Sequence, residues 1–312
     1  MTPLNAIRSP DPQGPHDKAK AKTGFRGFGR RQALALLMPV LIGLPLAAQA
    51  QTELSDLAKV RASGVLKVAV YKDNAPFAEG PASDMKGLDV ALAGALAKAM
   101  NLRLALLPFD ADENMGDDLR NMVWKGHYLG YGPADVMLQV PVDKYLMDDN
   151  PQVLVVGPYM RQSFVLLRAT DQLAQVQRPE DLKGKTIAAE RGTGAASAMM
   201  GYGGGLLRNQ VQIYNTGMEA GEAVLKGQAA AAYLTRAQAE AALHRSGLQP
   251  ARFELGSLPL NGIPNNGWPV GMAVKKSNRE LGQAIEVALK SLRDSGELLK
   301  IFQEQGMTLT AP

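Results

Sequence analysis

The sequence predicts an α/β protein of two lobes with a ligand-binding cleft between them. After residue 50, segments typical of strands alternate with segments typical of helices, and this alternation favours sheets of mostly parallel strands. The alternation falls into two blocks, and a late strand followed by two helices closes the chain. A length of 312 residues suits about two domains. We therefore expect two lobes joined by crossing strands, with ligand at the carboxyl ends of the strands.

The first block contains five predicted strands. A short helix is expected over residues 54–63, and a second helix presents an apolar face at helical spacing: Leu88, Ala91, Leu92, Ala95, Leu96 and Ala99. An acidic loop over 110–118 leads to a helix over 119–125. The strands are expected over 65–70, 102–108, 135–138, 153–157 and 163–167, the last two flanking Pro158-Tyr159.

The second block repeats the alternation. Strands are expected over 186–189 and 211–214, and helices over 218–226 and up to about residue 244. The turn Gly192-Thr193-Gly194 starts a helix that the glycine run 201–205 makes short or broken. Residues 229–232 are all alanine, the best helix former, but the alternation favours a strand there. Residues 247–270 are rich in Pro and Gly.

The C-terminal part is predicted as a strand and two helices. After a strand over 271–274, Ser277 and Glu280 have the spacing of a capping box. The helix that follows places Leu281, Ile285, Ala288, Leu289 and Leu292 on one face. A break at 294–296 precedes the last helix.

The charge of the chain is unevenly distributed. Residues 1–50 hold seven of the 34 Lys and Arg residues and two of the 30 Asp and Glu residues, which leaves 27 basic and 28 acidic residues in the remainder. A nearly neutral body has no overall attraction for nucleic acid or for an anionic membrane. We expect neither as a partner.

Residues 1–50 have the pattern of an export signal. A basic region ends at Arg30-Arg31, an apolar run covers 33–46, and Ala48-Gln49-Ala50 fits a cleavage site. The apolar run is shorter than the roughly 20 residues of a spanning helix. Arg30-Arg31 suggests a twin-arginine signal without its consensus Phe, so Sec and Tat export both stay open. The absence of Cys excludes disulfides, thiolate metal sites and a lipid-modified anchor, and we expect a periplasmic protein without a membrane anchor.

Six motifs occur in the order in which a known family has them. They are Leu66-Lys-Val-Ala-Val-Tyr71 with Pro76-Phe77, Gly87-Leu-Asp-Val-Ala-Leu-Ala93, Asp135-Val-Met-Leu138, Gly157-Pro158-Tyr159, Glu180-Asp-Leu-Lys-Gly184 with Gly192-Thr193-Gly194, and Gly271-Met-Ala-Val-Lys-Lys276. In these motifs the chain resembles the bacterial solute-binding proteins of family 3. The resemblance implies a two-lobed type II periplasmic binding protein fold, with a signal peptide over 1–50, lobe 1 over 51–159 and 270–312, and lobe 2 over 160–269.

The chain departs from the family at the expected ligand anchors. Members that bind amino acids usually follow the Asp-Val strand with Gly, Thr or Ser and an Arg that grips the ligand carboxylate. Here residues 139–147 contain no Ser, Thr or Arg, and the acid that usually receives the ligand ammonium falls near Leu234-Thr235. Two lost charge-assisted hydrogen bonds remove about 3–6 kcal/mol. We therefore do not expect ordinary amino-acid capture.

An aromatic and Gly-rich run over 124–133, with Val140-Pro-Val-Asp143 behind it, is similar to a narrower group. These are periplasmic binding-protein homologues that accompany PQQ-dependent methanol and related alcohol dehydrogenases (methanol oxidation J protein-like). The resemblance implies a non-catalytic accessory factor whose partner is a quinoprotein dehydrogenase, with its cytochrome c as a further candidate. The alternative is an ABC-transporter receptor for a solute other than a standard amino acid, with an ABC permease as partner.

Ten residues are candidates for the cleft or a partner surface: Tyr71, Phe77, Trp124, His127, Tyr128, Tyr131, Gln139, Thr193, Gly194 and Tyr233. Aromatic side chains supply much of the energy of interfaces, although the run 124–133 is alternatively a packed loop over an edge of lobe 1. Thr193 and Gly194 stand where backbone amides at a helix N-terminus bind anions, or where they form only a turn. Tyr71 and Phe77 are expected to face the cleft, or else to lie in the core.

The sequence indicates no catalytic group, cofactor or metal. With no Cys and only His127 and His244 after the leader, no catalytic set stands out. The acidic loop from Asp110 resembles a calcium loop, but its glycine is one place late and Asn121 occupies the twelfth position, where Glu belongs. We interpret it as a solvated acidic loop.

Overall fold

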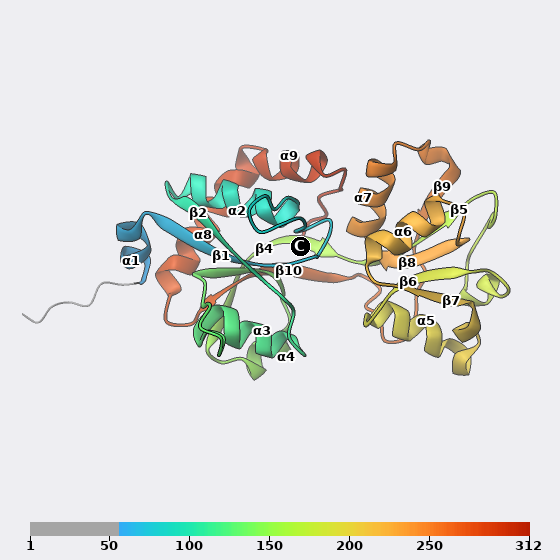
Figure 1. Cartoon of the computed structure of the whole chain (residues 1–312), viewed down its shortest axis with the longest axis horizontal. Coiled ribbons are helices and arrows are strands. Elements are labelled where there is room, and N and C mark those ends of the chain that lie inside the picture. Colours follow the sequence, from blue (N-terminus) through green and yellow to red (C-terminus); the bar gives the residue numbers. More distant parts are fainter. Residues whose placement is uncertain (1–55) are drawn as a thin grey trace, which may run out of the picture. The chain divides into compact units, whose positions relative to one another are not determined.

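The computed structural model describes residues 56–312, so the predicted export signal lies outside the described residues. These residues form two five-stranded sheets, with strand orders β2-β1-β3-β10-β4 and β7-β6-β8-β5-β9 (Figure 1). We call the residues packed around the first and second sheets the first and second lobes. The predicted two-lobed α/β fold is confirmed. Among residues 56–312, no helix is both long and apolar enough to cross a membrane.

The first lobe contains five strands and most of the helices. Its strands are β1 (Val65–Tyr71), β2 (Arg103–Phe109), β3 (Val136–Pro141), β4 (Val153–Gln162) and β10 (Trp268–Lys275). Its helices are α1 (Asp56–Ser63), α2 (Leu88–Ala99), α3 (Met115–Leu119), the π-helical turn η1 (Arg120–Trp124), α4 (Lys144–Asp149), α8 (Arg279–Asp294) and α9 (Glu297–Glu304). Strands β1, β2 and β3 are parallel, and β10 runs antiparallel to β3 and β4.

The second lobe repeats this arrangement. Its strands are β5 (Phe164–Ala169), β6 (Ile187–Glu190), β7 (Val211–Tyr214), β8 (Ala231–Thr235) and β9 (Phe253–Gly256). Its α-helices are α5 (Gly194–Gly205), α6 (Gly217–Leu225) and α7 (Arg236–Ser246), and its 3₁₀ turns are η2 (Pro179–Leu182), η3 (Arg208–Gln210) and η4 (Pro250–Arg252). Strands β6, β7 and β8 are parallel, and β5 pairs antiparallel with β8 and β9.

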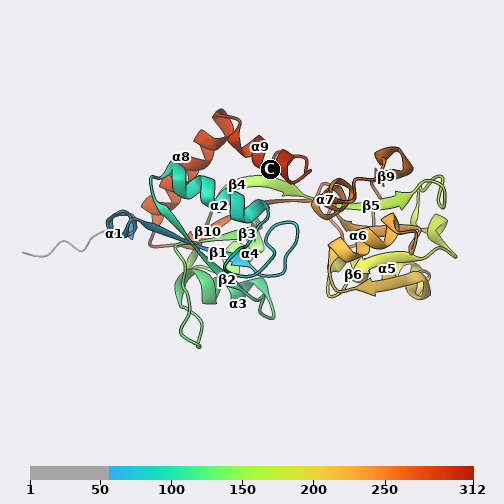
Figure 2. The ribbon, with the colours of Figure 1, turned by 45° about the horizontal axis from the view of Figure 1, so that its top comes forward.

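Each face of the first sheet carries its own apolar core, because successive strand residues point to opposite faces. Val68 and Val70 join a cluster with α2, α8 and α9, whereas Ala69 and Tyr71 join a cluster with Leu119 and η1. Figure 2 shows α2, α8 and α9 on one side of the sheet and α3 on the other. The two sides therefore offer separate environments for side chains at the strand ends.

One prediction in the second lobe is confirmed in part and another in full. Of the residues 229–232 predicted as a strand, Ala231 and Ala232 begin strand β8 between β6 and β5. Both alanines are buried, so pairing in the sheet overrides their helix propensity. Helix α5 is broken, as the glycine run predicts, with Gly203 and Gly204 at φ 55° and 71°. Left-handed backbone of this kind is easily adopted by glycine and ends the regular helix.

Two local predictions are wrong, and one helix was missed. Pro158 and Tyr159 do not separate two strands but lie within β4, which continues to Gln162. Helix α4 was not predicted, and its N-cap is Asp143, whose side chain accepts from the Leu146 amide. The capping box at Ser277 is absent, because helix α8 has Asn278 at its N-cap without a side-chain cap and the Ser277 hydroxyl donates to Asn278 instead.

Two segments connect the lobes. Strand β4 of the first sheet ends at Gln162 and β5 of the second begins at Phe164, while β10 brings the chain back at Trp268. Gly267, with φ 64°, lies so close to the outgoing strand that a Cβ there would be 1.9 Å from the Gln162 carbonyl oxygen. The two crossing segments are therefore in direct contact.

Candidate binding site

Tyr71 at the end of β1 is held by a polar contact and a ring contact. Its hydroxyl donates to Asp118 Oδ2 at 2.7 Å, and its ring lies 4.5 Å from that of Phe109 at the end of β2. Burial, with the neighbouring Asp118 carboxylate, raises the pKa of Tyr71 far above its usual range. Asp118 also accepts from the Asp112 amide at 2.8 Å. The Tyr71 hydroxyl thus remains a protonated donor.

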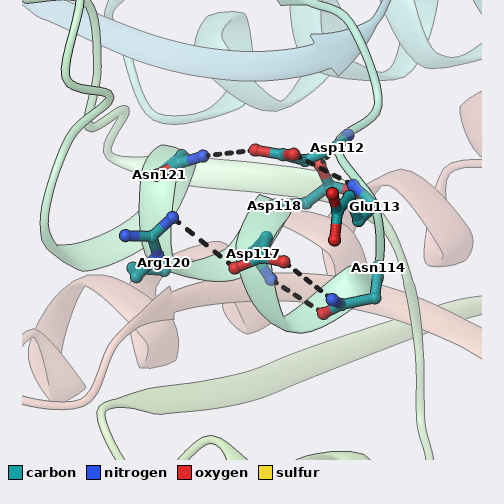
Figure 3. Close-up of polar contacts among 7 residues, drawn as sticks. All are labelled: Asp112, Glu113, Asn114, Asp117, Asp118, Arg120 and Asn121. Carbon is teal, nitrogen blue, oxygen red and sulfur yellow. Dashed lines mark hydrogen bonds and ion pairs between the residues drawn. The ribbon is translucent and has the colours of Figure 1, made fainter. Parts of the chain in front are cut away.

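Several polar side chains of the acidic loop contact one another and the residues that follow it (Figure 3). Asn121 Nδ2 donates to Asp112 Oδ2 at 2.9 Å, and Asn114 Oδ1 accepts from the Asp117 amide at 3.1 Å at the start of α3. Arg120 pairs with Asp117 at 3.5 Å. Across residues 56–312, no group of three or more His, Cys, Asp or Glu residues is arranged to hold a metal ion.

The aromatic loop, which we define as residues 126–133, contains a cluster of three rings, of which His127 and Tyr131 are stacked and Tyr128 is tilted. His127 lies between Tyr128 and Tyr131, with both ring centroids 4.3 Å from its own, and its plane is 14° from that of Tyr131. Together with the acidic loop these rings line a cavity of about 220 Å³. Tyr128 is 88% exposed and its neighbour Leu129 67%, so the loop ends in an exposed apolar tip.

Trp124 belongs to the core rather than to this tip. It is the last residue of η1, and it packs against the cluster that contains Leu119, Met122 and Val123. The structure thus brings His127, Tyr128 and Tyr131 together, whereas the partly buried Trp124 packs against the apolar cluster of the preceding turn.

Gln139 lies on the other face of the first sheet. It has φ 61°, and its Nε2 donates to Asp89 Oδ1 at 3.1 Å. The Tyr159 hydroxyl donates to the same oxygen at 3.3 Å, while Asp89 Oδ2 has no partner. Complete burial raises the pKa of Asp89 to about 7, because it disfavours the charged carboxylate. Gln139 and the aromatic loop therefore lie on opposite faces of the first sheet.

Phe77 and Tyr233 were expected at the cleft, but both are core residues. Phe77 is 4% exposed and lies in the cluster around α2, because the loop after β1 folds back so that its carbonyl accepts from the Asp89 amide. Tyr233 is 1% exposed, and its hydroxyl donates to the Leu258 carbonyl at 3.1 Å. Its ring stacks on Phe164, which in turn contacts Trp268 at the lobe crossing.

Thr193 and Gly194 form the start of α5. The Thr193 hydroxyl donates to the Glu190 carbonyl at 2.8 Å and accepts from the Ala196 amide at 3.2 Å, so it acts as the N-cap. Gly194 lies next to Ile263, whose Cδ1 would be 3.8 Å from a Cβ at this position. The side chain of Thr193 is thus committed to the helix.

Glu190 and Gln238 are polar residues at the second sheet that the sequence interpretation missed. Glu190 ends β6 and accepts from Gln238 Nε2 at 2.9 Å, and burial raises the pKa of its carboxyl group above the ordinary value. Gln238 also closes a capping box with Thr235, which ends β8. The Thr-x-x-Gln spacing of this box is visible in the sequence and marks the start of α7.

Comparisons with known proteins agree with this architecture. A family model described as NMT1/THI5 like matches residues 146–266. A search of curated proteins finds no match.

Solved structures match over most of the chain. An ancestral cationic amino acid solute binding protein is 21% identical with a TM-score of 0.62, covering 81% of this chain and 100% of its own. A polar amino acid ABC uptake transporter substrate binding protein from Streptococcus thermophilus is 19% identical, with a TM-score of 0.61 and coverage of 83% and 92%. An amino acid ABC transporter substrate-binding protein from Streptococcus pneumoniae, bound to L-arginine, is 18% identical, with a TM-score of 0.58 and coverage of 83% and 100%. The chain has the two-lobed fold of the periplasmic binding proteins.

Proposed function

We propose that this protein is a solute-binding receptor that holds a small molecule between its lobes and presents it to an ABC permease. The observation that carries the proposal is the pair of sheets joined by crossing strands. Each sheet has parallel strands that end in polar or aromatic residues, Tyr71 in the first and Glu190 and Thr235 in the second. Folds of this kind bind ligands at the carboxyl ends of their strands. The ABC-transporter proteins of similar fold support the same role.

The solute that we propose is an uncharged or apolar molecule. The strand end where related proteins carry an Arg presents Gln139, and its amide is engaged by the buried Asp89. On the second sheet the Glu190 carboxyl group disfavours an anionic group beside it. A zwitterion would therefore leave its carboxylate without a charged partner, which is costly once the group is desolvated.

A thermal-shift screen followed by calorimetry tests this receptor role. We expect the standard amino acids to leave the melting temperature unchanged and an uncharged solute to raise it by several degrees, because selective binding stabilises the native state. Glu190→Gln should alter the shift, whereas Asp171→Asn, which affects only an exposed ion pair with Arg252, should not. Micromolar binding of a standard amino acid would contradict the proposal.

A second candidate function is that of an accessory factor for a PQQ-dependent dehydrogenase. The exposed tip formed by Tyr128 and Leu129 favours it, since exposed aromatic and apolar side chains are typical anchors of protein interfaces. A photoreactive residue placed at Tyr128 should crosslink to the dehydrogenase in cells that produce both proteins. If the same residue at Tyr145, which is 78% exposed on α4, crosslinks equally well, the contact is not specific to the loop.

In either role we propose an exported, non-catalytic protein. The carboxyl groups of Asp118 and Glu190, which contact the strand-end regions, already accept hydrogen bonds from neighbouring side chains. Export is supported by the signal-like residues 1–50. One similar ancestral protein is described as a precursor of cyclohexadienyl dehydratase, so an assay of the purified protein for that dehydration is the direct check on catalysis.

A further inference from the structure

Helix α7 of the second lobe contacts two segments of the first lobe outside the crossing strands. Arg245 forms a two-point ion pair with Glu79, in the loop between β1 and α2, in which Nη1 donates to Oε2 at 3.1 Å and Nη2 donates to Oε1. Glu240 Oε2 accepts from the backbone amide of Thr308, after α9, at 2.7 Å. Both first-lobe segments are far from α7 in sequence, so these contacts depend on how the lobes are arranged.

The same side of α7 also packs closely on the first lobe. A Cβ at Gly306, which has φ 71°, would lie 2.2 Å from the His244 Cγ, so the C-terminal segment passes the helix at a distance that only glycine permits. Ala237 and Ala241 belong to the apolar cluster that also contains Phe77 and Met307 of the first lobe. Polar and apolar contacts thus coincide on this helix.

These residues share one face of the helix. The contacting positions follow the i, i+3, i+4, i+7, i+8 pattern of a single helical stripe: Ala237, Glu240, Ala241, His244 and Arg245. A cavity of about 410 Å³ beside the stripe is lined by Glu240, His244, Gly306 and Thr308 among others. The stripe therefore borders an open cavity where α7 meets the C-terminal segment.

We propose that this face of α7 is a latch that sets the equilibrium between lobe arrangements. In this proposal the lobes reorient about the two crossing segments. The contacts of α7 with the first lobe then form in only one of the lobe arrangements. Any free energy that they contribute favours that arrangement over the others. The latch rests on the fold alone. Any effect of the latch on the affinity for a solute rests on the proposed solute-binding role.

The expected size of the effect follows from the exposure of the ion pair. The Arg245 and Glu79 side chains are 39% and 36% exposed, so solvent screens their attraction. Loss of the pair should change the lobe equilibrium about threefold to fivefold, which corresponds to roughly 0.6–1 kcal/mol. Because salt screens the ion pair, salt near 1 M should shift the lobe equilibrium of the parent protein in the same direction as loss of the pair.

Distance measurement between spin labels tests the latch without any solute. The chain contains no Cys, so Lys98→Cys on α2 and Lys183→Cys in the second lobe provide two labelling sites. In this labelled protein, Arg245→Gln should populate a second distance between the two spin labels. The charge exchange Glu79→Arg with Arg245→Glu should restore the distance distribution of the parent protein. Lys226→Gln is the matched control. It removes an ion pair with Glu222 that lies within the second lobe, at the end of α6, and it should leave the distance distribution unchanged.

A second variant tests the close approach rather than the charge. Gly306→Ala should wedge the C-terminal segment away from His244 and populate the same second distance. If Arg245→Gln and Gly306→Ala both leave the distribution unchanged, the latch is overturned. If the charge exchange fails to reverse the effect of Arg245→Gln, the ion pair is not its basis. These results are independent of the solute screen, so failure of the receptor role and failure of the latch are distinguishable.

Discussion

Asp89 is a carboxyl group in the interior of the first lobe whose surroundings favour its neutral form. One oxygen accepts from Gln139 and Tyr159, and the other has no hydrogen-bond partner, so the buried carboxylate would receive only two hydrogen bonds in place of its hydration. Burial raises its pKa from 3.8 to about 7. Below about pH 3 the group is mostly neutral in both the folded and the unfolded chain, and near pH 6 it is mostly neutral only in the folded chain.

This difference predicts a pH dependence of stability. Between about pH 4 and pH 7 the folded state binds more protons than the unfolded state, so the Asp89 contribution to the free energy of unfolding falls as pH rises, by roughly 1 kcal/mol per pH unit. In the Asp89→Asn variant the side chain stays neutral, so this contribution to the slope of unfolding free energy against pH should be absent. Urea unfolding of both proteins across this range measures it, and parallel stability curves would contradict the prediction.

A second residue-scale prediction concerns Tyr71 and Asp118. Tyr71→Phe removes the 2.7 Å hydrogen bond and leaves an Asp118 oxygen without that donor in a partly buried position. The cost should be about 1–3 kcal/mol of unfolding free energy. A double-mutant cycle with Asp118→Asn isolates the coupling. A coupling near zero would show that water replaces the tyrosine hydroxyl.

At the scale of elements, truncation of side chains in the aromatic loop and truncation of Trp124 before it should change the free energy of unfolding by different amounts. Tyr128→Ala and Leu129→Ala remove exposed side chains and should change the free energy of unfolding by less than about 0.5 kcal/mol. Trp124→Ala removes a ring packed on the core around Leu119 and Met122, and should cost about 2–4 kcal/mol. Chemical denaturation distinguishes the two classes, and a large loss with Tyr128→Ala would mean that the tip is itself a lid on the core.

Most elements were predictable because their patterns are local. The apolar stripe of α2 and the later stripe from Leu281 to Leu292 identify helices directly. The later stripe is buried throughout, whereas the α2 stripe is buried at its leucines and exposed at Ala99. The failures are of another kind. Helix α4 is six residues long and has no buried residue, so it has no apolar periodicity to detect. The capping box at Ser277 has the right spacing, but the backbone of Asn278 takes the N-cap position.

At the scale of the whole molecule, the lobe crossing depends on a single glycine. Gly267→Ala would bring a Cβ within 1.9 Å of the Gln162 carbonyl oxygen, a rigid backbone atom, so the crossing segments must move apart. Gly262→Ala is the matched control, because φ 82° makes it strained while nothing lies within 4 Å. We expect the control to lose about 1 kcal/mol and Gly267→Ala several times more. If thermal or urea unfolding gives equal losses of stability for the two variants, backbone strain alone accounts for both losses.

The candidate site was only partly predictable from the sequence. Aromatic character marked Phe77, Tyr128 and Tyr233 alike, yet the structure buries the first and last and exposes the second. Nothing local distinguishes them, since burial depends on which distant elements pack over a strand end. Glu190 and Gln238 were missed because their contact joins β6 to α7 across 48 residues.

The sequence by itself determined the two blocks of alternating strands and helices, the apolar faces of the long helices and the absence of an Arg anchor between residues 121 and 160. These follow from periodicity and composition, which are properties of neighbouring residues. Only the tertiary structure decided that Gln139 engages Asp89, that the aromatic loop lies on the opposite face of the sheet, and that α7 contacts the first lobe. Such contacts join residues far apart in the chain, and their partners are fixed by packing and not by local pattern.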